Sequence, residues 1–406
     1  MVDEINHDDL PDVAEHPGPQ IGSPVGPWML TGWIVGLIFL AATLFCARTA
    51  HAQDAPLTLG GFADLGYLFA PNEPFNQVFR SRGTTWHVND PFLNMAVVYA
   101  RRPSTSASRL GGEITVQTGK DSEIFGFSAT APNLSAAEWL RHLGPTSVSY
   151  LADVGQGLTL QGGIFSSLIG YDSLYARDNF NYTRPWGADF TPYLMLGVNG
   201  SYPLTEKVTA TAFLVNGYWH LANANPVPSF GGQVAAAMTP RLTVKETVMA
   251  GPHQADTAFG SWRFISDSIV EHKTDRIVIA FNGHVATERI AEGSPFGIPG
   301  SRAWWVAAQL PLQWQVDGPW RIALRPEIAR DSTGRWTLAE QTVTAMTSTL
   351  EYRTAFRSLG TSLKFEYRVD HSTGAQGGFF TGREGELTPT QHLWIVAAIV
   401  RFDRTQ

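Results

Sequence analysis

Apolar and polar residues alternate with a period of two over most of the chain that follows residue 53. Residues 361–371 give an example, with apolar side chains on one face of an extended chain and charged side chains on the other: Leu363, Phe365, Tyr367 and Val369 against Lys364, Glu366, Arg368 and Asp370. This period predicts β-strands with one apolar and one polar face. Residues 275–285, 302–316 and 319–330 repeat the pattern, so the chain is predicted to be all-β.

The predicted strands are long for a soluble sheet. Many approach the length of roughly ten residues with which a tilted strand crosses a membrane. Trp304, Trp314 and Trp320 stand near strand ends, where membrane barrels carry aromatic girdles. We predict sixteen strands, at 57–69, 91–102, 110–118, 144–153, 157–165, 191–202, 206–216, 229–238, 241–250, 261–270, 275–285, 302–316, 319–330, 338–354, 358–370 and 391–402.

The connections between these strands alternate in length. Short ones, such as 155–156, take turns with longer ones, such as 70–90, 119–143 and 166–190. Outer-membrane barrels combine short periplasmic turns with longer external loops, and a sheet in lipid must close because every backbone group needs a partner. We therefore predict a closed antiparallel transmembrane β-barrel of about 16 strands. A soluble β-sandwich is the alternative, but it gives no reason for connection lengths to alternate.

Residues 1–52 are predicted to be an N-terminal extension and signal peptide, and residues 53–406 to be the transmembrane β-barrel. The stretch from Pro27 to Ala52 has an apolar core and ends in Ala50-His51-Ala52, the small-x-small pattern of a signal-peptidase site. A single membrane anchor is the alternative, because the apolar run approaches spanning length.

Charge and composition narrow the chemistry. A net charge of −7 with 16% charged residues excludes the basic patch that nucleic-acid binding requires. The single cysteine, Cys46, lies in the leader, so a thiol nucleophile is excluded from residues 53–406. The chain has no HExxH, GxSxG or phosphate-loop motif, and its histidines lack metal-ligand spacing. We expect no catalytic residues, no metal site and no cofactor.

Within the longer connection 119–143, residues 133–142 predict a short helix. Ser135 and Glu138 have the spacing of a capping box.

The motifs GQGLTLQGGIFSSLIGYDSL at 155–174, DNFNYTRP at 178–185, GVNGSYPL at 197–204 and FLVNGYWHL at 213–221 resemble those of bacterial outer-membrane porins of the type-2 β-barrel porin family. Ile169-Gly170-Tyr171 matches the family pattern, and Asp172 stands where a glutamate is expected. The chain departs from the usual barrel ending, because Asp403 to Gln406 follow the last predicted strand. The resemblance covers nearly all of residues 53–406 and implies a channel without catalytic residues.

Two groups of residues are candidates for controlling solute passage. The third long connection, 166–190, is expected to fold into the lumen, because family resemblance and its length favour an inward loop over a solvated surface loop. Opposed charges across such a constriction select solutes. The candidate constriction residues are Tyr171, Asp172, Arg177, Asp178, Arg184 and Asp189.

The second group lies on the polar faces of the strands and is predicted to line the pore. Its members form a basic ladder with interleaved acids, which is typical of a weakly anion-preferring wall; the alternative is that these charges only hydrate the lumen and pair across strands. The candidate pore-lining residues are Arg276, Arg321, Arg325, Glu327, Arg353, Lys364, Glu366 and Arg368.

The predicted function is a porin of the bacterial outer membrane. A barrel of about sixteen strands leaves an aqueous channel, through which small hydrophilic solutes or ions diffuse passively. The alternatives are a non-conducting barrel with an adhesive or structural role and a barrel enzyme. The expected partners are outer-membrane lipid and the solutes or ions, with no nucleic acid, and a homo-oligomer stays open.

Overall fold

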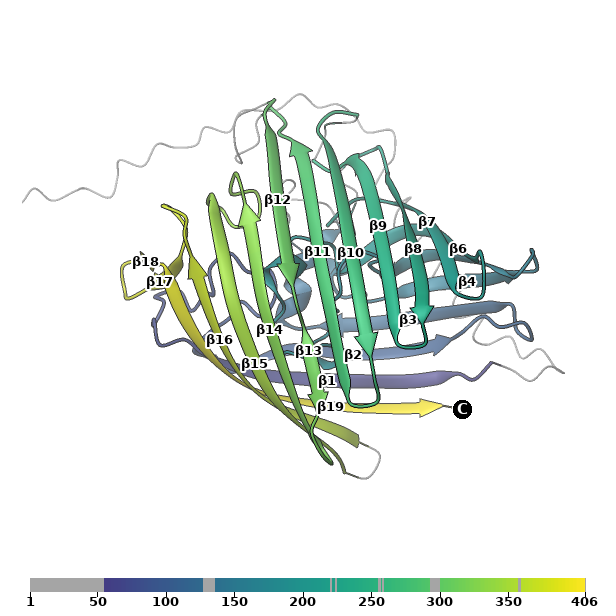
Figure 1. Ribbon diagram of the computed structural model, residues 1–406, viewed down its shortest axis with the longest axis horizontal. Coiled ribbons are helices and arrows are strands. Elements are labelled where there is room, and N and C mark those ends of the chain that lie inside the picture. Colours follow the sequence, from purple (N-terminus) through teal and green to yellow (C-terminus); the bar gives the residue numbers. More distant parts are fainter. Residues whose placement is uncertain are drawn as a thin grey trace, which may run out of the picture.

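The structure is a computed structural model that describes residues 55–126, 136–219, 221–222, 225–254, 257, 259–292, 300–356 and 359–405. The predicted N-terminal extension and signal peptide, residues 1–52, lie outside the described residues. Long antiparallel strands dominate the described chain (Figure 1). The strands of the main sheet are β1 (Thr58–Phe69), β2 (Phe92–Arg102), β3 (Leu110–Thr118), β4 (Thr146–Ala152), β5 (Leu158–Ser166), β6 (Leu194–Pro203), β7 (Val208–Val215), β8 (Ser229–Thr239), β9 (Leu242–Pro252), β10 (Trp262–Lys273), β11 (Ile277–Arg289), β12 (Arg302–Gln309), β13 (Leu312–Gln315), β14 (Trp320–Asp331), β15 (Gln341–Phe356), β16 (Leu359–Ser372) and β19 (Thr390–Thr405).

The sheet closes into a barrel because its first and last strands pair. β1 and β19 run antiparallel with an unbroken register from Thr58 opposite Thr405 to Phe69 opposite Trp394. The sheet contains 17 described strands, but β12 and β13 both pair with β11 and β14 and so form one barrel strand. The barrel therefore has 17 − 1 = 16 strands. The predicted closed antiparallel barrel and its strand number are confirmed.

The sequence prediction differs from the structure in three local features. The predicted strand 302–316 is interrupted at Leu310 and Pro311, because proline has no backbone N–H to donate to the ladder. The last external loop carries an unpredicted hairpin, β17 (Phe379–Thr381) and β18 (Glu386–Thr388). Within the described part of the predicted helix, α2 spans Ala137–Leu140 and follows Ala136, which has a left-handed conformation and no side-chain cap. The predicted capping residue Ser135 lies outside the described residues.

The connections follow the predicted alternation. Short turns join β4 to β5, β6 to β7, β8 to β9 and β10 to β11, and those of β8–β9 and β10–β11 lie at the lower strand ends in Figure 1. The longer connections lie at the opposite ends, among them 70–91, which we call loop 1, and 167–193, which we call loop 3. Loop 3 contains η2 (Ala176–Asp178) and α3 (Trp186–Asp189).

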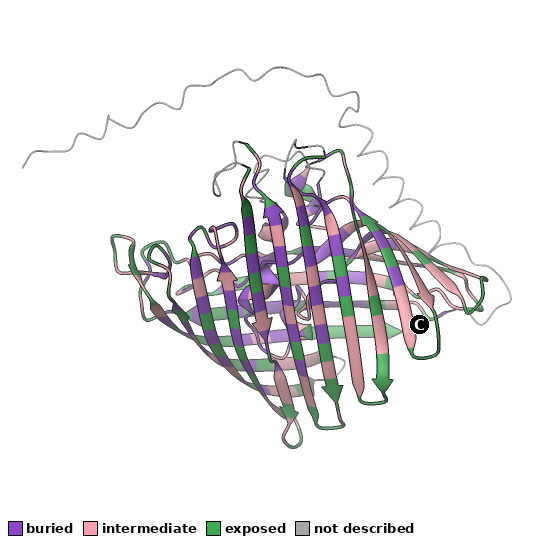
Figure 2. Ribbon diagram, turned by 45° about the horizontal axis from the view of Figure 1, so that its top comes forward, coloured by how far each residue is buried: buried purple, intermediate pink, exposed green. Residues whose placement is uncertain are grey.

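The two faces of the wall differ as the period of two predicts. Along β16, the outward Leu363 and Phe365 are exposed, whereas the inward Lys364 and Glu366 are buried. Figure 2 shows this alternation of buried and exposed residues along many strands. The apolar residues therefore cover the outside of the barrel, and the polar residues turn toward its interior.

Glycine stands where neighbouring backbones approach too closely for a side chain. Gly163 on β5 lies opposite Gly197 on β6. A Cβ at Gly163 would lie 2.4 Å from the carbonyl oxygen of Thr146, and one at Gly197 would lie 2.1 Å from that of Leu214. Gly163 also has a φ of 126°, which side chains disfavour. Close strand approach therefore explains why Gly163 and Gly197 are glycines.

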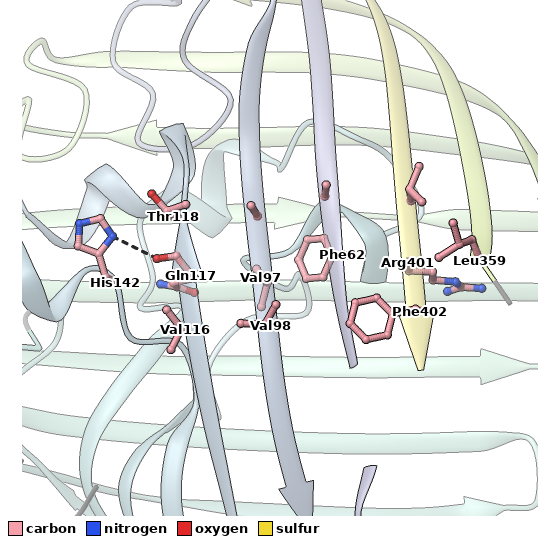
Figure 3. A pocket seen from close by; sticks show the side chains of 13 residues that line it. Phe62, Val97, Val98, Val116, Gln117, Thr118, His142, Leu359, Arg401 and Phe402 are labelled. Atoms are coloured by element: carbon pink, nitrogen blue, oxygen red, sulfur yellow. Dashed lines mark hydrogen bonds between the residues drawn. The ribbon is translucent and has the colours of Figure 1, made fainter. Parts of the chain in front are cut away.

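An apolar groove of about 560 Å³ crosses the wall at β1, β2, β3 and β19 (Figure 3). Its sides include the exposed Val98, Val116 and Phe402, with His142 near one end bonded to the carbonyl oxygen of Gln117. A second apolar groove, of about 680 Å³, runs over β8 to β12 between Phe230 and Trp304. Both grooves are lined mainly by apolar residues, and the first also borders the polar side chains of Gln117, Thr118, His142 and Arg401.

One carboxylate faces outward beside the second groove. Glu246 on β9 is exposed and alternates with the outward Val244 and Val248. It accepts hydrogen bonds from Ser266 Oγ at 2.6 Å and from Ser268 Oγ on β10. The two hydroxyl groups partly solvate a charge on an otherwise apolar surface.

Candidate functional site

Loop 3 lies inside the barrel and crosses from β5 to the opposite wall. Its short helix α3 contacts β12 and β14, and helical turns are visible between the front and back walls in Figures 1 and 2. Tyr182, Thr183 and Arg184 are completely buried against strands that are distant in sequence. Hydrogen bonds and ion pairs with the wall hold the loop there.

Glu366 on β16 forms the densest of these contacts. One carboxylate oxygen accepts from the Thr183 backbone N–H at 2.9 Å and from Thr183 Oγ1 at 2.5 Å. The other accepts from the Tyr182 backbone N–H at 2.5 Å and from Thr349 Oγ1 at 2.6 Å. A carboxylate that accepts several buried hydrogen bonds fixes its donors strongly, because bonds to charged groups are the stronger kind.

The wall cations bind the loop through its carbonyl oxygens. Lys364 Nζ donates to the carbonyl oxygens of Ala176 at 3.1 Å and Asn179 at 2.6 Å. Arg325 Nη1 donates to that of Thr183 at 2.6 Å. Both side chains are fully buried, so loop 3 covers their charges.

Trp186 fixes the far end of the loop. Its backbone N–H donates to Glu327 at 2.5 Å, and its indole Nε1 donates to Asp370 at 2.8 Å. Arg368 forms ion pairs with the same two carboxylates, at 3.0 Å to Glu327 and 2.8 Å to Asp370. Arg368 also donates to the carbonyl oxygen of Arg184 at 2.9 Å.

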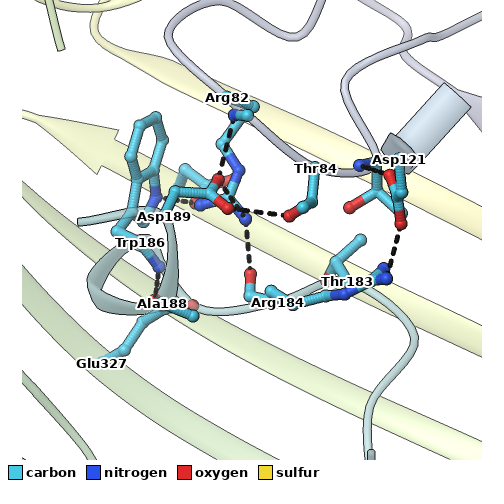
Figure 4. A network of polar contacts seen from close by, with 12 residues as sticks. Arg82, Thr84, Asp121, Thr183, Arg184, Trp186, Ala188, Asp189 and Glu327 are labelled. Carbon is cyan, nitrogen blue, oxygen red and sulfur yellow. Dashed lines mark hydrogen bonds and ion pairs between the residues drawn. The ribbon is translucent and has the colours of Figure 1, made fainter. Parts of the chain in front are cut away.

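Loop 1 packs on loop 3 through a second polar network (Figure 4). Arg82 pairs with Asp189 at 3.1 Å, and the Gly83 N–H and the Thr84 hydroxyl donate to the same carboxylate at 3.1 and 2.8 Å. Arg184 pairs with Asp121 at 2.5 Å, within the 3-10 helix η1 (Lys120–Phe125). Three long connections are thus joined through buried ion pairs.

Aromatic side chains close this assembly on the external side. Phe79 of loop 1, Trp186 of loop 3 and Phe379 of β17 surround one another, with ring centroids 5.7 to 6.3 Å apart. Two of these contacts are edge-on and the one between Trp186 and Phe379 is tilted, and aromatic pairs of both kinds add to the stabilisation from buried apolar surface. The unpredicted hairpin therefore contributes to the packing of loop 3.

Each candidate constriction residue contacts the barrel wall or a neighbouring loop, or lies next to a residue that does. Tyr171 donates its hydroxyl to Glu271 on β10 at 2.6 Å, and Asp172 accepts from Gln309 on β12 at 2.5 Å. Arg177 lies over the ring of Phe62 and pairs with the adjacent Asp178 at 3.3 Å. Arg184 and Asp189 are buried in the network with loop 1. Among the six, Asp178 has the most exposed charge.

The candidate pore-lining residues divide into a covered and an accessible group. Arg325, Glu327, Lys364, Glu366 and Arg368 are buried beneath loop 3, so they bind the loop. Arg321 is half-buried on β14, and Arg353 pairs with Glu351 at 2.9 Å with its side chain 30% exposed. Arg276 lies in the short turn before β11 and is exposed.

Several residues of the site have no signal in the sequence pattern. Arg82 and Asp121 belong to irregular connections, and their ion pairs join segments far apart in the chain. Thr85 and Ser81 adopt positive φ values of 46° and 63°, which are uncommon for such residues. Contacts between segments far apart in the chain, and not a local sequence pattern, determine these ion pairs and backbone conformations.

Burial perturbs two acidic groups of the loops. It raises the pKa of Asp172, against the opposing effect of Arg325. It also raises the pKa of Asp121, against the opposing effect of Arg184. Both carboxyl groups therefore bind protons more readily than exposed aspartates do.

No group of three or more His, Cys, Asp or Glu side chains that could hold a metal ion occurs among the described residues. In the same part of the chain, no helix is both long and apolar enough to cross a membrane.

Comparisons with known proteins agree with this architecture. The model of the family described as "Putative beta-barrel porin-2, OmpL-like" matches residues 56–402. A search of curated proteins gives no significant match.

Solved structures of low sequence identity share the fold. The anion-selective porin from Comamonas acidovorans superimposes with a TM-score of 0.53 and 12% identity, covering 86% of this chain and 99% of that chain. The in-vitro folded OmpT of Vibrio cholerae gives 0.51 and 12%, covering 88% and 100%. Its trimer form gives 0.50 and 11%, covering 86% and 100%.

Proposed function

This chain belongs to the beta-barrel porin-2, OmpL-like family, and we propose that it forms a water-filled channel through which small hydrophilic solutes or ions diffuse passively. Its location is the bacterial outer membrane, where the apolar outer wall contacts lipid and the closed sheet leaves no unpaired edge. The proposal includes no chemical step, and we propose that the protein acts as a channel and not as an enzyme.

The observation that carries the proposal is the attachment of loop 3 to the inner wall of the barrel. Its contacts with Glu327, Lys364 and Glu366 fasten residues 176–186 to the wall formed by β14 and β16. Barrels of sixteen strands are wide enough to leave an aqueous channel beside such a loop. Loop 3 also contacts β10 and β12, so in this proposal it crosses the lumen and narrows the channel.

The charges that remain accessible would set the ion preference. The covered cations Arg325, Lys364 and Arg368 contact carboxylates or carbonyl oxygens, so their fields are largely compensated. Arg321 and Arg353 on β14 and β15 remain partly exposed, as does Asp178 on loop 3. Because accessible charges of both signs remain, we expect a weaker anion preference than the sequence alone predicts.

Liposome swelling tests the proposal. Liposomes that contain the purified protein should swell in isotonic solutions of small neutral sugars, and the rate should fall as the sugar becomes larger. A folded barrel that leaves every liposome impermeable would contradict a channel. That result would favour a non-conducting barrel with an adhesive or structural role.

Oligomerisation is a separate part of the proposal. The Vibrio cholerae OmpT that shares the fold has a trimer form. We propose that this chain likewise forms a homo-oligomer in the outer membrane. Chemical cross-linking in intact outer membranes, followed by denaturing electrophoresis, would detect it.

A further inference from the structure

Two arginines lie opposite each other on the lipid-facing side of the wall, at the external ends of β11 and β12 (Figure 1). Arg289 on β11 is the register partner of Arg302 on β12, and both residues are exposed. Buried and exposed residues alternate along these strands, so the arginines share the outer face with Val285 and Trp304. Like charges directly opposite each other across a β-ladder repel, and an anion bound between them would relieve that repulsion.

The charges of this pair are not compensated by the wall. In the described part of the chain, neither Arg289 nor Arg302 forms an ion pair, and Arg302 Nη1 donates to the neutral Thr287 Oγ1 at 3.4 Å. The adjacent acid, Glu288, is buried on the inner side of the wall and pairs there with Arg263 at 2.9 Å. Two positive charges therefore face the membrane at this end of the barrel.

A third arginine on the same face already has an acidic partner. Arg330 on β14 pairs with Glu340 at 2.5 Å, and its guanidinium carbon lies 5.9 Å from the centroid of the Trp304 ring. Of these three arginines, Arg289 and Arg302 keep their charges for a ligand.

The second apolar groove begins beside the arginine pair. Thr287, which accepts the hydrogen bond from Arg302, lines the groove together with Trp304. From there the groove extends over Phe264 to Phe230, with a volume of about 680 Å³. Van der Waals packing joins apolar surfaces within a bilayer, so a hydrocarbon chain suits this groove.

Aromatic residues indicate how deep the arginines lie in the membrane. Phe264, Thr287 and Trp304 form one row across β10, β11 and β12. Such aromatic girdles lie where the hydrocarbon meets the lipid headgroups. Arg302 lies two residues closer to the external end of β12 than Trp304 does, which places its charge at the level of the headgroups.

We propose that Arg289, Arg302 and the second groove form a binding site for a phosphate-bearing lipid of the outer leaflet. The two guanidinium groups bind the phosphate, because their planar arrays of donors match its oxygens. An acyl chain of the same lipid lies in the groove. The site is on the outer surface of the barrel, so it goes beyond the proposed channel function and does not depend on conduction.

Native mass spectrometry of the purified protein in detergent would measure the binding. The probes are didecanoyl phosphatidic acid, didecanoyl phosphatidylcholine, in which a quaternary ammonium compensates the phosphate, and glycerol 3-phosphate, which has no acyl chain. We expect phosphatidic acid to bind about tenfold more tightly than phosphatidylcholine, because its phosphate keeps its charge for the arginines. Glycerol 3-phosphate should not be retained.

Three substitutions and a control locate the site. Arg289→Gln and Arg302→Gln should each weaken the binding of phosphatidic acid about tenfold and leave that of phosphatidylcholine unchanged. Val285→Trp places a larger side chain in the groove and should weaken the binding of both lipids. Arg404→Gln removes an exposed arginine opposite Leu59, at the other end of the barrel, and should leave the binding of both lipids unaltered.

The wild-type comparison of the two lipids tests the proposal even if a variant fails to fold. Equal binding of phosphatidic acid and phosphatidylcholine overturns the site, as does binding of phosphatidic acid that neither arginine substitution weakens. Equally tight binding of glycerol 3-phosphate would show a site for free anions and would also overturn the lipid site. Loss of an oligomer in the arginine variants, with unchanged lipid binding, would identify a second copy of the chain as the occupant and overturn the proposal.

Discussion

Replacing Glu366 by glutamine should release the central part of loop 3 from the wall. The carboxylate has an oxygen for each of two donor groups, one centred on the Tyr182 N–H and one on the Thr183 N–H. Glutamine offers one oxygen and one NH₂ group, so either orientation leaves one buried backbone N–H facing a donor. The hydroxyls of Thr183 and Thr349 can rotate, but a backbone N–H cannot reverse its role.

The expected magnitude follows from that single lost acceptor. A hydrogen bond to a charged group contributes about 1.5–3 kcal/mol, and a buried donor left without a partner costs about 1–3 kcal/mol. A combined loss of roughly 3 kcal/mol in the free energy of loop opening corresponds to about a 100-fold change in the opening equilibrium. The barrel itself should remain folded, because its strand ladders do not depend on Glu366.

Amide hydrogen exchange measures this opening directly. The amides of Tyr182 and Thr183 should exchange about 100-fold faster in the Glu366→Gln protein, since exchange follows the population of the open state. Glu351→Gln is the matched control, because Glu351 contacts Ser362 at 2.5 Å and Arg353 at 2.9 Å, both on the wall. Unchanged exchange in Glu366→Gln, or an equal rise in Glu351→Gln, would refute the anchoring of loop 3 by Glu366.

Three further predictions concern the wall and the buried acid. Glu246→Val should raise the free energy of unfolding by about 1 kcal/mol, because a charge that faces lipid is unfavourable. Urea titration of the protein in lipid vesicles would measure this change. A lower free energy of unfolding would contradict the outward placement of Glu246. Gly163→Val should destabilise the barrel by about 2 kcal/mol or more in the same titration, because its Cβ would lie 2.4 Å from the Thr146 carbonyl oxygen; wild-type stability would contradict the close approach of β4 and β5. Burial raises the pKa of Asp172 above its ordinary 3.8, with Arg325, Glu327 and Arg184 as the neighbouring charges, so the folded state keeps this proton to higher pH than the unfolded state. The contribution of Asp172 to the free energy of unfolding should therefore fall as pH rises from 3.8 through the folded pKa of Asp172. The Asp172→Asn protein should lack this pH-dependent contribution. Identical pH profiles of stability for the two proteins would contradict the raised pKa.

The barrel could be predicted from the sequence because each strand carries its own signal. The alternation of residues such as Leu363, Lys364, Phe365 and Glu366 fixes which side chains face outward, and a slip of one residue would invert every face. The alternating connection lengths then indicate which strand ends are periplasmic, at the short turns, and which are external, at the longer loops. The break at Pro311 could not be predicted in this way, because apolar and polar residues continue to alternate on both sides of it.

The site was less accessible to sequence reasoning. Loop 3 could be proposed from its length and motifs, but its attachment depends on backbone N–H groups of Tyr182 and Thr183, which any residue would provide. Arg82 and Asp121 lie in segments without periodicity, and their partners are far away in the chain. The charges predicted to face water, such as Arg325 and Lys364, instead face loop 3, because folding satisfies buried charges wherever partners are available.

The central claim is that this barrel conducts, and single-channel recording of the purified protein in a planar lipid bilayer under a salt gradient tests it most directly. The account predicts stable, discrete current steps, because a barrel of sixteen strands leaves an aqueous channel. A protein that is folded and inserted in the bilayer but carries no current would contradict the account.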